Sequence, residues 1–204
     1  MIKIKGGSGG LSLLELIVAL SLFSLIVFGF GSLDLFSHFH MITSDRRATI
    51  QNDVSFVLEH MAKEISRAIG NEMVYGPNTV VNYTSSNDLS VVAVYIDGNG
   101  NGQREPGNTV DFWVGYEADL SQNQIGYCSQ CTEDDCIACA SDWEVLSSRI
   151  TAFTITRPDP PENNIEAQLT ACWDPLESQY QCGTSDNPSI SMSNRIKMQS
   201  VATN

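Results

Sequence analysis

The segment Gly9-Gly10-Leu11-Ser12-Leu13-Leu14-Glu15-Leu16 opens a run of apolar residues that continues to about Phe30. Glu15 is the only charged side chain in this run, and the stretch from Leu16 to Leu33 carries no charge. A helix of this length is just long enough to span the roughly 30 Å hydrocarbon core of a bilayer. A carboxylate in such a segment costs about 2.5 to 3.5 kcal/mol on insertion scales, so it usually has a partner and a function. We therefore predict a membrane helix in which Glu15 has a specific role.

The start of this run resembles the N-terminal motif of type IV pilins and type II secretion pseudopilins, with a glycine, an apolar residue and a glutamate at the fifth position after the glycine. The resemblance implies that a prepilin peptidase cleaves between Gly10 and Leu11 and methylates the new N-terminus. It implies that residues 1–10, with Lys3 and Lys5, are a short basic leader. Glu15 is then the family's assembly glutamate. We expect it to attract the N-terminal amine of a neighbouring subunit, more strongly where water is excluded.

Two other interpretations of the apolar run explain less of the sequence. A secretory signal peptide has a cleavage site with small residues after its apolar core. Residues 31–38 instead read Gly-Ser-Leu-Asp-Leu-Phe-Ser-His. A plain membrane anchor has the right length, but it gives no role to Glu15 or to the paired glycines before the run.

A second helical pattern follows the apolar run, and strand-like segments follow that. Gly70 is a natural stop for the helix. Apolar residues recur at helical spacing at Val54, Val57, Leu58, Met61, Ile65, Ala68 and Ile69. Segments rich in β-branched and aromatic residues predict strands at 79–84, 89–96, 109–116, 145–156, 165–173 and 189–201. Short linkers between these segments favour antiparallel pairing.

This order of elements predicts an α+β chain that resembles the pilin fold, in which a long N-terminal helix packs on an antiparallel β-sheet with disulfide-rich loops. Residues 51–70 resemble the second half of the helix in W-type minor pilins and J-type pseudopilins, and residues 194–204 are similar to their last strand. The predicted parts are the leader (1–10), a transmembrane or filament-core half-helix (11–36), an amphipathic half-helix (37–70) and a β-rich globular domain (71–204).

The loop from Asp97 to Asp111 is a candidate calcium site. Oxygen-bearing side chains alternate along it, with glycine at the sixth position, as at the start of a calcium loop. The candidate ligands are Asp97, Asn99, Asn101, Gln103, Glu105 and Asp111. Asn108 stands where an EF-hand has its bidentate glutamate, and a strand precedes the loop rather than a helix. The alternative is a glycine-rich hairpin loop, for which Asp-Gly and Asn-Gly are themselves typical.

The six cysteines indicate disulfides in an exported domain. Cys172 and Cys182 are expected to pair with each other. Four others form the pattern Cys128-x2-Cys131-x4-Cys136-x2-Cys139. Two disulfides, whose connectivity the spacing leaves open, are expected here, and zinc held by four thiolates is the alternative.

The formal net charge of −13 makes nucleic acid an unexpected partner, because such a surface repels phosphate backbones, and it favours divalent cations. The leading hypothesis is a structural minor pilin or pseudopilin, first a single-pass protein of the bacterial inner membrane and then part of a periplasmic or cell-surface filament. Its expected partners are other pilin subunits and the prepilin peptidase. The alternatives are an adhesive module at a pilus tip, displayed by the cysteine-rich and Asp97 loops, and an anchored thiol-disulfide protein. No spacing indicates a catalytic residue, so we do not expect an enzyme.

Overall fold

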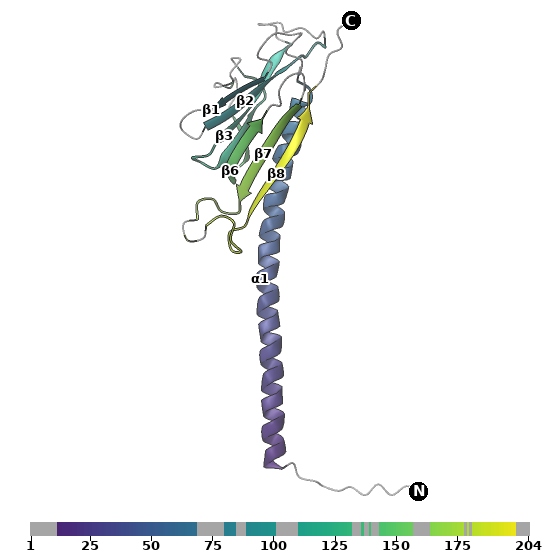
Figure 1. The fold of residues 1–204 in the computed structure, drawn as a ribbon, viewed down its shortest axis with the longest axis vertical. Coiled ribbons are helices and arrows are strands. Elements are labelled where there is room, and N and C mark those ends of the chain that lie inside the picture. The colour runs from purple at the N-terminus through teal and green to yellow at the C-terminus, as the bar shows by residue number, and fades with distance from the viewer. Residues whose placement is uncertain are drawn as a thin grey trace, which may run out of the picture. The chain divides into compact units, whose positions relative to one another are not determined.

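The computed structural model describes residues 12–68, 80–84, 89–100, 110–131, 136, 139, 143–156, 164–177, 179 and 181–198. One helix, α1 (Leu13–Ile65), begins the described part of the chain. The strands that follow are β1 (Val80–Thr84), β2 (Leu89–Ile96), β3 (Phe112–Asp119), β4 (Gln124–Cys128), β5 (Glu144–Ser147), β6 (Ile150–Thr156), β7 (Asn164–Cys172) and β8 (Ser189–Lys197). Figure 1 shows these elements along the chain. They divide into two compact units, Met1–Ser44 and Asp45–Asn204.

The described part of the first unit is the apolar portion of α1. Every residue from Ser12 to Ile42 is exposed, including the bulky side chains of Leu14, Phe23 and Phe30. The helix contains an 18-residue window with a mean hydropathy of 2.5, so it is long and apolar enough to cross a membrane. No described residue of this unit covers its apolar surface.

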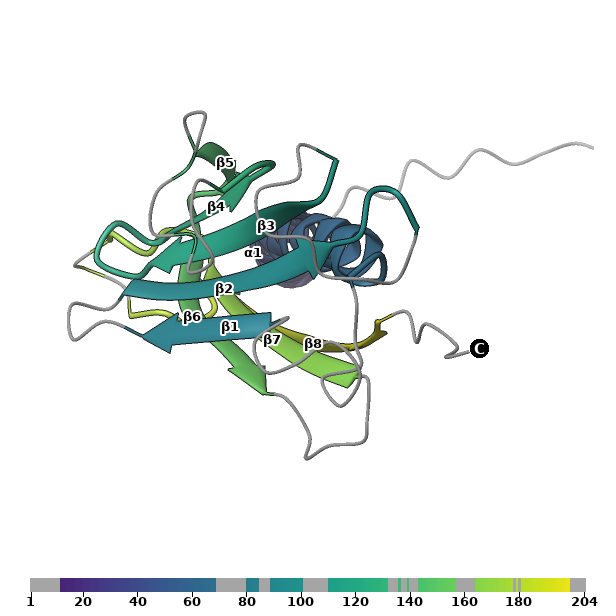
Figure 2. The same cartoon turned by 90° about the horizontal axis from the view of Figure 1, so that it is seen from above.

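The second unit contains the rest of α1 and two antiparallel sheets. One sheet has the order β1-β2-β3-β4-β5 and the other has the order β6-β7-β8, so each is a simple meander. Figure 2 shows them as separate sheets. The α+β class is as predicted, but the strands form two sheets instead of the single predicted sheet.

The second sheet arises because the segment predicted as one strand at 145–156 is two strands. β5 ends at Ser147, and β6 begins at Ile150 in the other sheet. The backbone N–H of Ile150 donates to the carbonyl of Asn123, 2.9 Å away in the turn between β3 and β4. Arg149 binds Asp53 of α1, with 2.5 Å between Nη1 and Oδ2. These contacts of Arg149 and Ile150 hold the chain where it passes from one sheet to the other, and periodicity alone does not reveal this.

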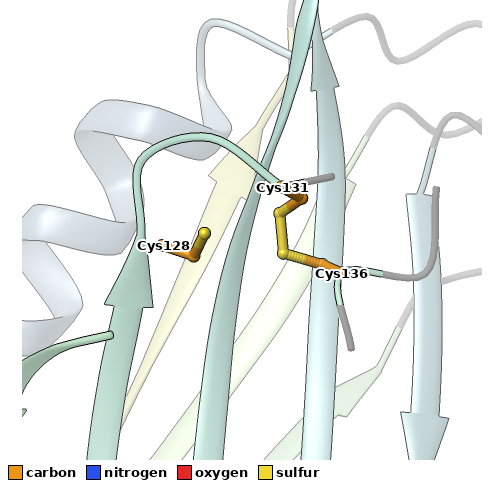
Figure 3. A group of neighbouring side chains, drawn as sticks. All are labelled: Cys128, Cys131 and Cys136. Carbon is orange, nitrogen blue, oxygen red and sulfur yellow. A yellow bond between two sulfur atoms is a disulfide. The ribbon is translucent and has the colours of Figure 1, made fainter. Parts of the chain in front are cut away.

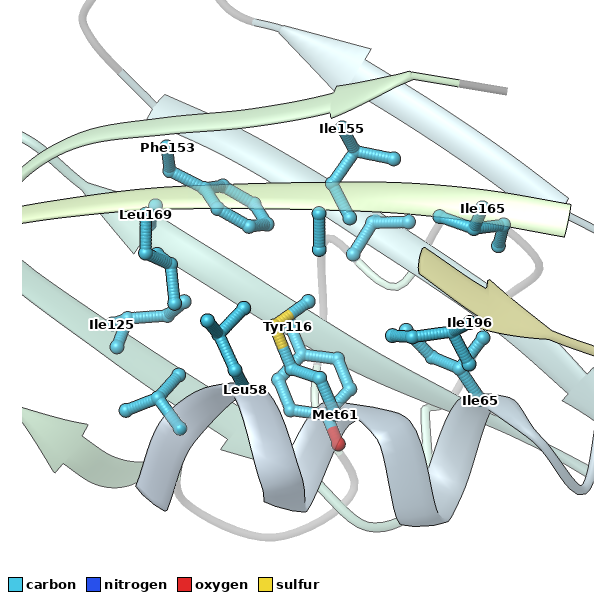
Figure 4. Packing of buried hydrophobic residues seen from close by; sticks show 14 of the residues in the cluster. Leu58, Met61, Ile65, Tyr116, Ile125, Phe153, Ile155, Ile165, Leu169 and Ile196 are labelled. Atoms are coloured by element: carbon cyan, nitrogen blue, oxygen red, sulfur yellow. The ribbon is translucent and has the colours of Figure 1, made fainter. Parts of the chain in front are cut away.

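The main core lies between the second portion of α1 and the two sheets. Figure 4 shows Leu58, Met61 and Ile65 of α1 facing Tyr116 and Ile125 of the first sheet and side chains of β6, β7 and β8. The described residues of the predicted apolar face are all buried: Val54, Val57, Leu58, Met61, Ile65 and Ala68. Burying such a face is the main source of stability for a helix in a folded protein.

The helix ends earlier than predicted. Residues Ser66 and Arg67 form a turn, and Ala68 pairs with Ile96 in an isolated β-bridge. The N–H groups of Arg67 and Ala68 donate to carbonyls three residues back, which tightens the last turn. Ile69 and Gly70 lie outside the described residues.

Strand β2 is covered on both faces. Val92, Val94 and Ile96 face the main core, whereas Val91, Ala93 and Tyr95 belong to a second, smaller cluster with three cysteines. Successive side chains of a strand point to opposite faces, so the unbroken apolar run of β2 requires two covers. The segment that carries the cysteines supplies the second cover.

Candidate functional site

The predicted processing and assembly residues lie at the start of α1. Gly10 and Leu11 are outside the described residues. Glu15 is in the first turn of the helix, where its Oε2 accepts a hydrogen bond from the N–H of Ser12 at 3.0 Å. The N–H of Glu15 donates in return to Oγ of Ser12 at 3.2 Å. These two bonds form a capping box, which satisfies N–H groups that have no partner within the helix.

The sequence Ser12-Leu13-Leu14-Glu15 carries the signal for this capping role, although the role is not among the predictions made from the sequence. A serine followed three residues later by glutamate just before an apolar run is a typical helix start. Glu15 thus has a structural role inside its own chain. Any role in assembly must be separated from this one by experiment.

Part of the candidate calcium loop is described. Asp111 is buried, and its two oxygens accept hydrogen bonds from the Tyr95 hydroxyl and the Gly98 N–H, both at 3.1 Å. Asp97 Oδ1 accepts from the N–H of Gly100 at 2.7 Å. Asn99 is described, whereas Asn101, Gln103 and Glu105 lie outside the described residues. Asp111 therefore closes the base of the hairpin, and calcium binding stays a prediction.

Gly98 explains why this hairpin base is so narrow. A Cβ at this position would lie 2.0 Å from the backbone oxygen of Val110. Real Cβ atoms do not approach a backbone atom so closely, so only glycine fits here without movement of the Val110 backbone. The glycine after Asp97 is thus required by packing and is not by itself evidence for a metal.

All six cysteines form disulfides. Cys172 is joined to Cys182, the pair expected from the sequence. The other two disulfides are Cys128–Cys139 and Cys131–Cys136. Each of these joins a cysteine of the first Cys-x-x-Cys motif to one of the second, and neither motif closes on itself. In this form the sulfurs are not thiolates.

The two nested disulfides lie against the outer face of the first sheet. Figure 3 shows Cys131 bonded to Cys136, with Cys128 beside them at the end of β4. A Cβ on Gly115 of β3 would lie 2.2 Å from Sγ of Cys136, so this strand needs a glycine beneath the sulfur. Among the described His, Cys, Asp and Glu side chains, only Cys128, Cys131 and Cys136 form a group of three or more with ligand atoms within 4.8 Å of one another.

A buried polar group lies where α1 meets the first sheet. Glu64 is buried and pairs with Arg67, with 2.8 Å between Oε2 and Nη1. Tyr116 donates to the carbonyl of His60 at 3.2 Å, and its oxygen lies 3.0 Å from Nδ1 of the same residue. Burial, followed by the charge of Glu64, raises the pKa of Tyr127 to about 12. Burial raises the pKa of Tyr116 as well, with Tyr127 as the next cause.

A small open pocket lies next to the loop that Cys172 and Cys182 close. Its volume is about 300 Å³, and it is lined by Ser148, Arg149, Trp173, Asp174, Pro175 and Leu176. The guanidinium carbons of Arg149 and Arg46 lie 4.8 Å and 5.8 Å from the ring centre of Trp173. Arg46 also donates to the carbonyl of Asp186. These contacts attach the loop to the part of α1 that begins the second unit.

The described residues thus bring the four clustered cysteines together and place Glu15 at the start of an uncovered apolar helix. They do not bring the candidate calcium ligands into a group of three acidic side chains. Comparison with known proteins finds no matching family model, no matching curated protein and no matching solved structure.

Proposed function

We propose that this protein is a structural subunit of a type IV pilus or a type II secretion pseudopilus, in the class of minor pilins or minor pseudopilins. A prepilin peptidase cleaves it between Gly10 and Leu11. The first portion of α1 then holds it in the inner membrane, and the same portion joins the filament. The globular unit is what the filament displays.

The observation that carries the proposal is the exposure of the first portion of α1. Bulky apolar residues such as Leu13, Phe28 and Phe30 are each at least 70% exposed. Exposed apolar surface of this extent indicates a membrane or a protein partner. A bilayer supplies that partner before assembly, and the equivalent helices of other subunits supply it afterwards.

Glu15 supports a filament over a simple anchor. It stands inside the apolar run, where a carboxylate is costly. A neighbouring subunit's N-terminal amine would neutralise it in the filament core. The capping box with Ser12 explains how the helix starts, but a glutamine performs this role equally well. The negative charge is therefore the part of Glu15 that needs a partner outside the chain.

The test separates the charge of Glu15 from its capping role. Glu15→Gln keeps an acceptor for the N–H of Ser12 but removes the charge. Ser12→Ala is the matched control, because it removes the Oγ acceptor and keeps the charge. Each variant is expressed in the native cell, its cleavage is followed by mass, and its amounts in membrane and filament fractions are measured.

We expect both variants to be cleaved. The Glu15→Gln protein should remain in the membrane and be absent from filaments, whereas the Ser12→Ala protein should be incorporated. Normal incorporation of Glu15→Gln would contradict the assembly role of the charge. Loss of incorporation in Ser12→Ala alone would assign Glu15 to capping only.

A further inference from the structure

We infer that the four clustered cysteines form a zinc site when their disulfides are reduced, with Cys128, Cys131, Cys136 and Cys139 as the ligands. The chain would then have two covalent forms of the same cluster, one closed by two disulfides and one closed by a metal ion. This inference does not depend on the proposed function.

The connectivity of the disulfides, which are nested and both join one motif to the other, is the first support. A tetrahedral site of four thiolates needs two ligands from each of two motifs that face each other. Here Cys128 is bonded to Cys139, and Cys131 is bonded to Cys136. Both disulfides run between the two motifs, so the motifs already face each other. Disulfides within each Cys-x-x-Cys would not require this arrangement.

Three of the four sulfurs lie at distances that fit a single ion, and the fourth, Sγ of Cys139, lies outside this group but is bonded to Sγ of Cys128. The Sγ atoms of Cys128, Cys131 and Cys136 lie within 4.8 Å of one another. Thiolates about 2.3 Å from a tetrahedral zinc ion are themselves roughly 3.8 Å apart. On reduction, each bonded pair has to separate by less than the length of a side chain. The site therefore requires a side-chain rotation that brings Sγ of Cys139 to the other three sulfurs.

The backbone holds the motifs in place through contacts other than the disulfides. The N–H of Cys131 donates to the carbonyl of Trp113 on β3, 2.9 Å away. Cys131 and Cys139 pair in an antiparallel β-bridge. Cys128 ends β4 and pairs with Gly115. Reduction breaks none of these hydrogen bonds, so we expect the thiols to stay together.

The surroundings suit a soft metal ion. Cys128 and Cys136 are fully buried, and the cluster is lined by aromatic side chains, including Tyr95 and Trp113. Gly115 leaves the space that the sulfurs occupy. Thiolates select zinc and similar ions over calcium and magnesium, which prefer oxygen ligands.

The conversion is balanced with a phosphine as the reductant. Each disulfide accepts two electrons from one phosphine, which water converts to the phosphine oxide, and the two protons of that water are taken up as the sulfurs become thiols. Two disulfides give four thiols. Zinc binding then releases up to four protons as the thiols become thiolates.

The experiment uses the full chain in detergent, reduced with a phosphine without oxygen and mixed with Co²⁺ or Zn²⁺. We expect one ion per chain and the visible spectrum of tetrahedral cobalt bound to thiolates, which zinc abolishes. With zinc present, iodoacetamide should modify Cys172 and Cys182 but not the four clustered cysteines, as read by peptide mass spectrometry. Cys136→Ser should lose the thiolate spectrum, and the control Cys172→Ser/Cys182→Ser should keep it.

Equal modification of all six cysteines in the presence of zinc would overturn the inference. Binding that survives Cys136→Ser, or that shows no cobalt-thiolate band, would also overturn it and would point to histidine or carboxylate ligands. Circular dichroism covers the case in which reduction unfolds the domain. A reduced domain that regains its fold on addition of zinc supports the site, and one that stays unfolded with zinc contradicts it.

Discussion

The two portions of helix α1 differ in what covers them. Up to Ile42 every described side chain is exposed, although most are apolar. From Ile50 onward one face is buried under two sheets, with Val54, Val57 and Met61 fully inaccessible. Among the residues that the structure describes, the second portion finds its partner within the chain, and the first portion does not. One continuous helix can therefore lie in two environments. The globular unit covers its second portion, whereas a membrane or another protein has to cover its first portion.

The largest expected effect comes from truncating a buried side chain in the second portion of α1. The comparison is the same truncation at an exposed residue in the first portion. Met61→Ala removes a fully buried side chain from the main core and should lower the free energy of unfolding by about 2–5 kcal/mol. Leu22→Ala, at a residue that is 57% exposed in the first portion, should change it by less than about 0.5 kcal/mol. Denaturant unfolding of the full chain in detergent measures both. Equal losses would mean that the first portion is packed within the chain.

The disulfide next to the last strands provides a second comparison. Cys172→Ser/Cys182→Ser opens a crosslink with a sequence separation of 10, which should lower the stability of the second unit by about 2–3 kcal/mol. Helix content in the first portion should not change, because the crosslink constrains only the second unit. Thermal unfolding followed by near-ultraviolet circular dichroism measures the loss. An unchanged transition would show that this loop is not constrained by the bond.

A pair of strand glycines tests whether the cysteines cover the outer face of the sheet. Gly115→Ala places a Cβ 2.2 Å from Sγ of Cys136, and the overpacking should cost about 1–3 kcal/mol. Gly126→Ala is the matched control, because the nearest atom lies 3.4 Å away on the Trp143 ring, at ordinary contact distance. Unfolding midpoints of the two variants give the comparison. Similar midpoints would mean that the disulfide does not lie over Gly115.

Titration of the tyrosines beneath α1 gives the smallest expected effect. The pKa of Tyr127 is raised to about 12, and a tyrosine in an unfolded chain titrates near about 10. The unfolded chain therefore releases this proton first as the pH rises. The contribution to stability is fully present below about pH 10 and is lost as the pH approaches about 12. Tyr127→Phe should make the decline in urea midpoint over that range less steep, and an identical decline would contradict the shift.

The sequence predicts an element best where burial alone determines its pattern of apolar residues. Residues 89–96 match β2 because an unbroken run of apolar and β-branched residues leaves little choice. The buried face of α1 is predicted for the same reason, since Val54, Met61 and Ile65 recur at helical spacing. Both patterns arise because these side chains are buried, and the order of apolar residues along the chain shows burial directly.

Other elements depend on distant contacts and so escape local patterns. β4 is a short strand with Gly126 at its centre, and it forms because it pairs with β3 and β5. The division between β5 and β6 depends on hydrogen bonds from Ile150 and Arg149 to residues elsewhere in the chain. The nested cysteine pairs follow from the placement of both motifs over β3. Spacing leaves that connectivity open, because several pairings satisfy it.

The candidate site also has one feature that the sequence predicts and one that it does not. Glu15 stands out as the only charge in an apolar run, which no folded contact is needed to see. Its bonds to Ser12 have a sequence signal of their own, a serine three residues before a glutamate, which coincides with the start of the membrane pattern. The charge thus has two candidate partners, one within the helix and one in a neighbouring subunit.

The most direct test of the account is the mass of the protein and of its N-terminal peptide after purification from native membranes. If the protein is the processed filament subunit that we propose, its chain begins at Leu11 with a methylated amine. A chain that still begins at Met1, or one that has been cut near residue 30, would contradict this account. The uncovered helix would then be a simple anchor or a removed signal, and Glu15 would be only a cap.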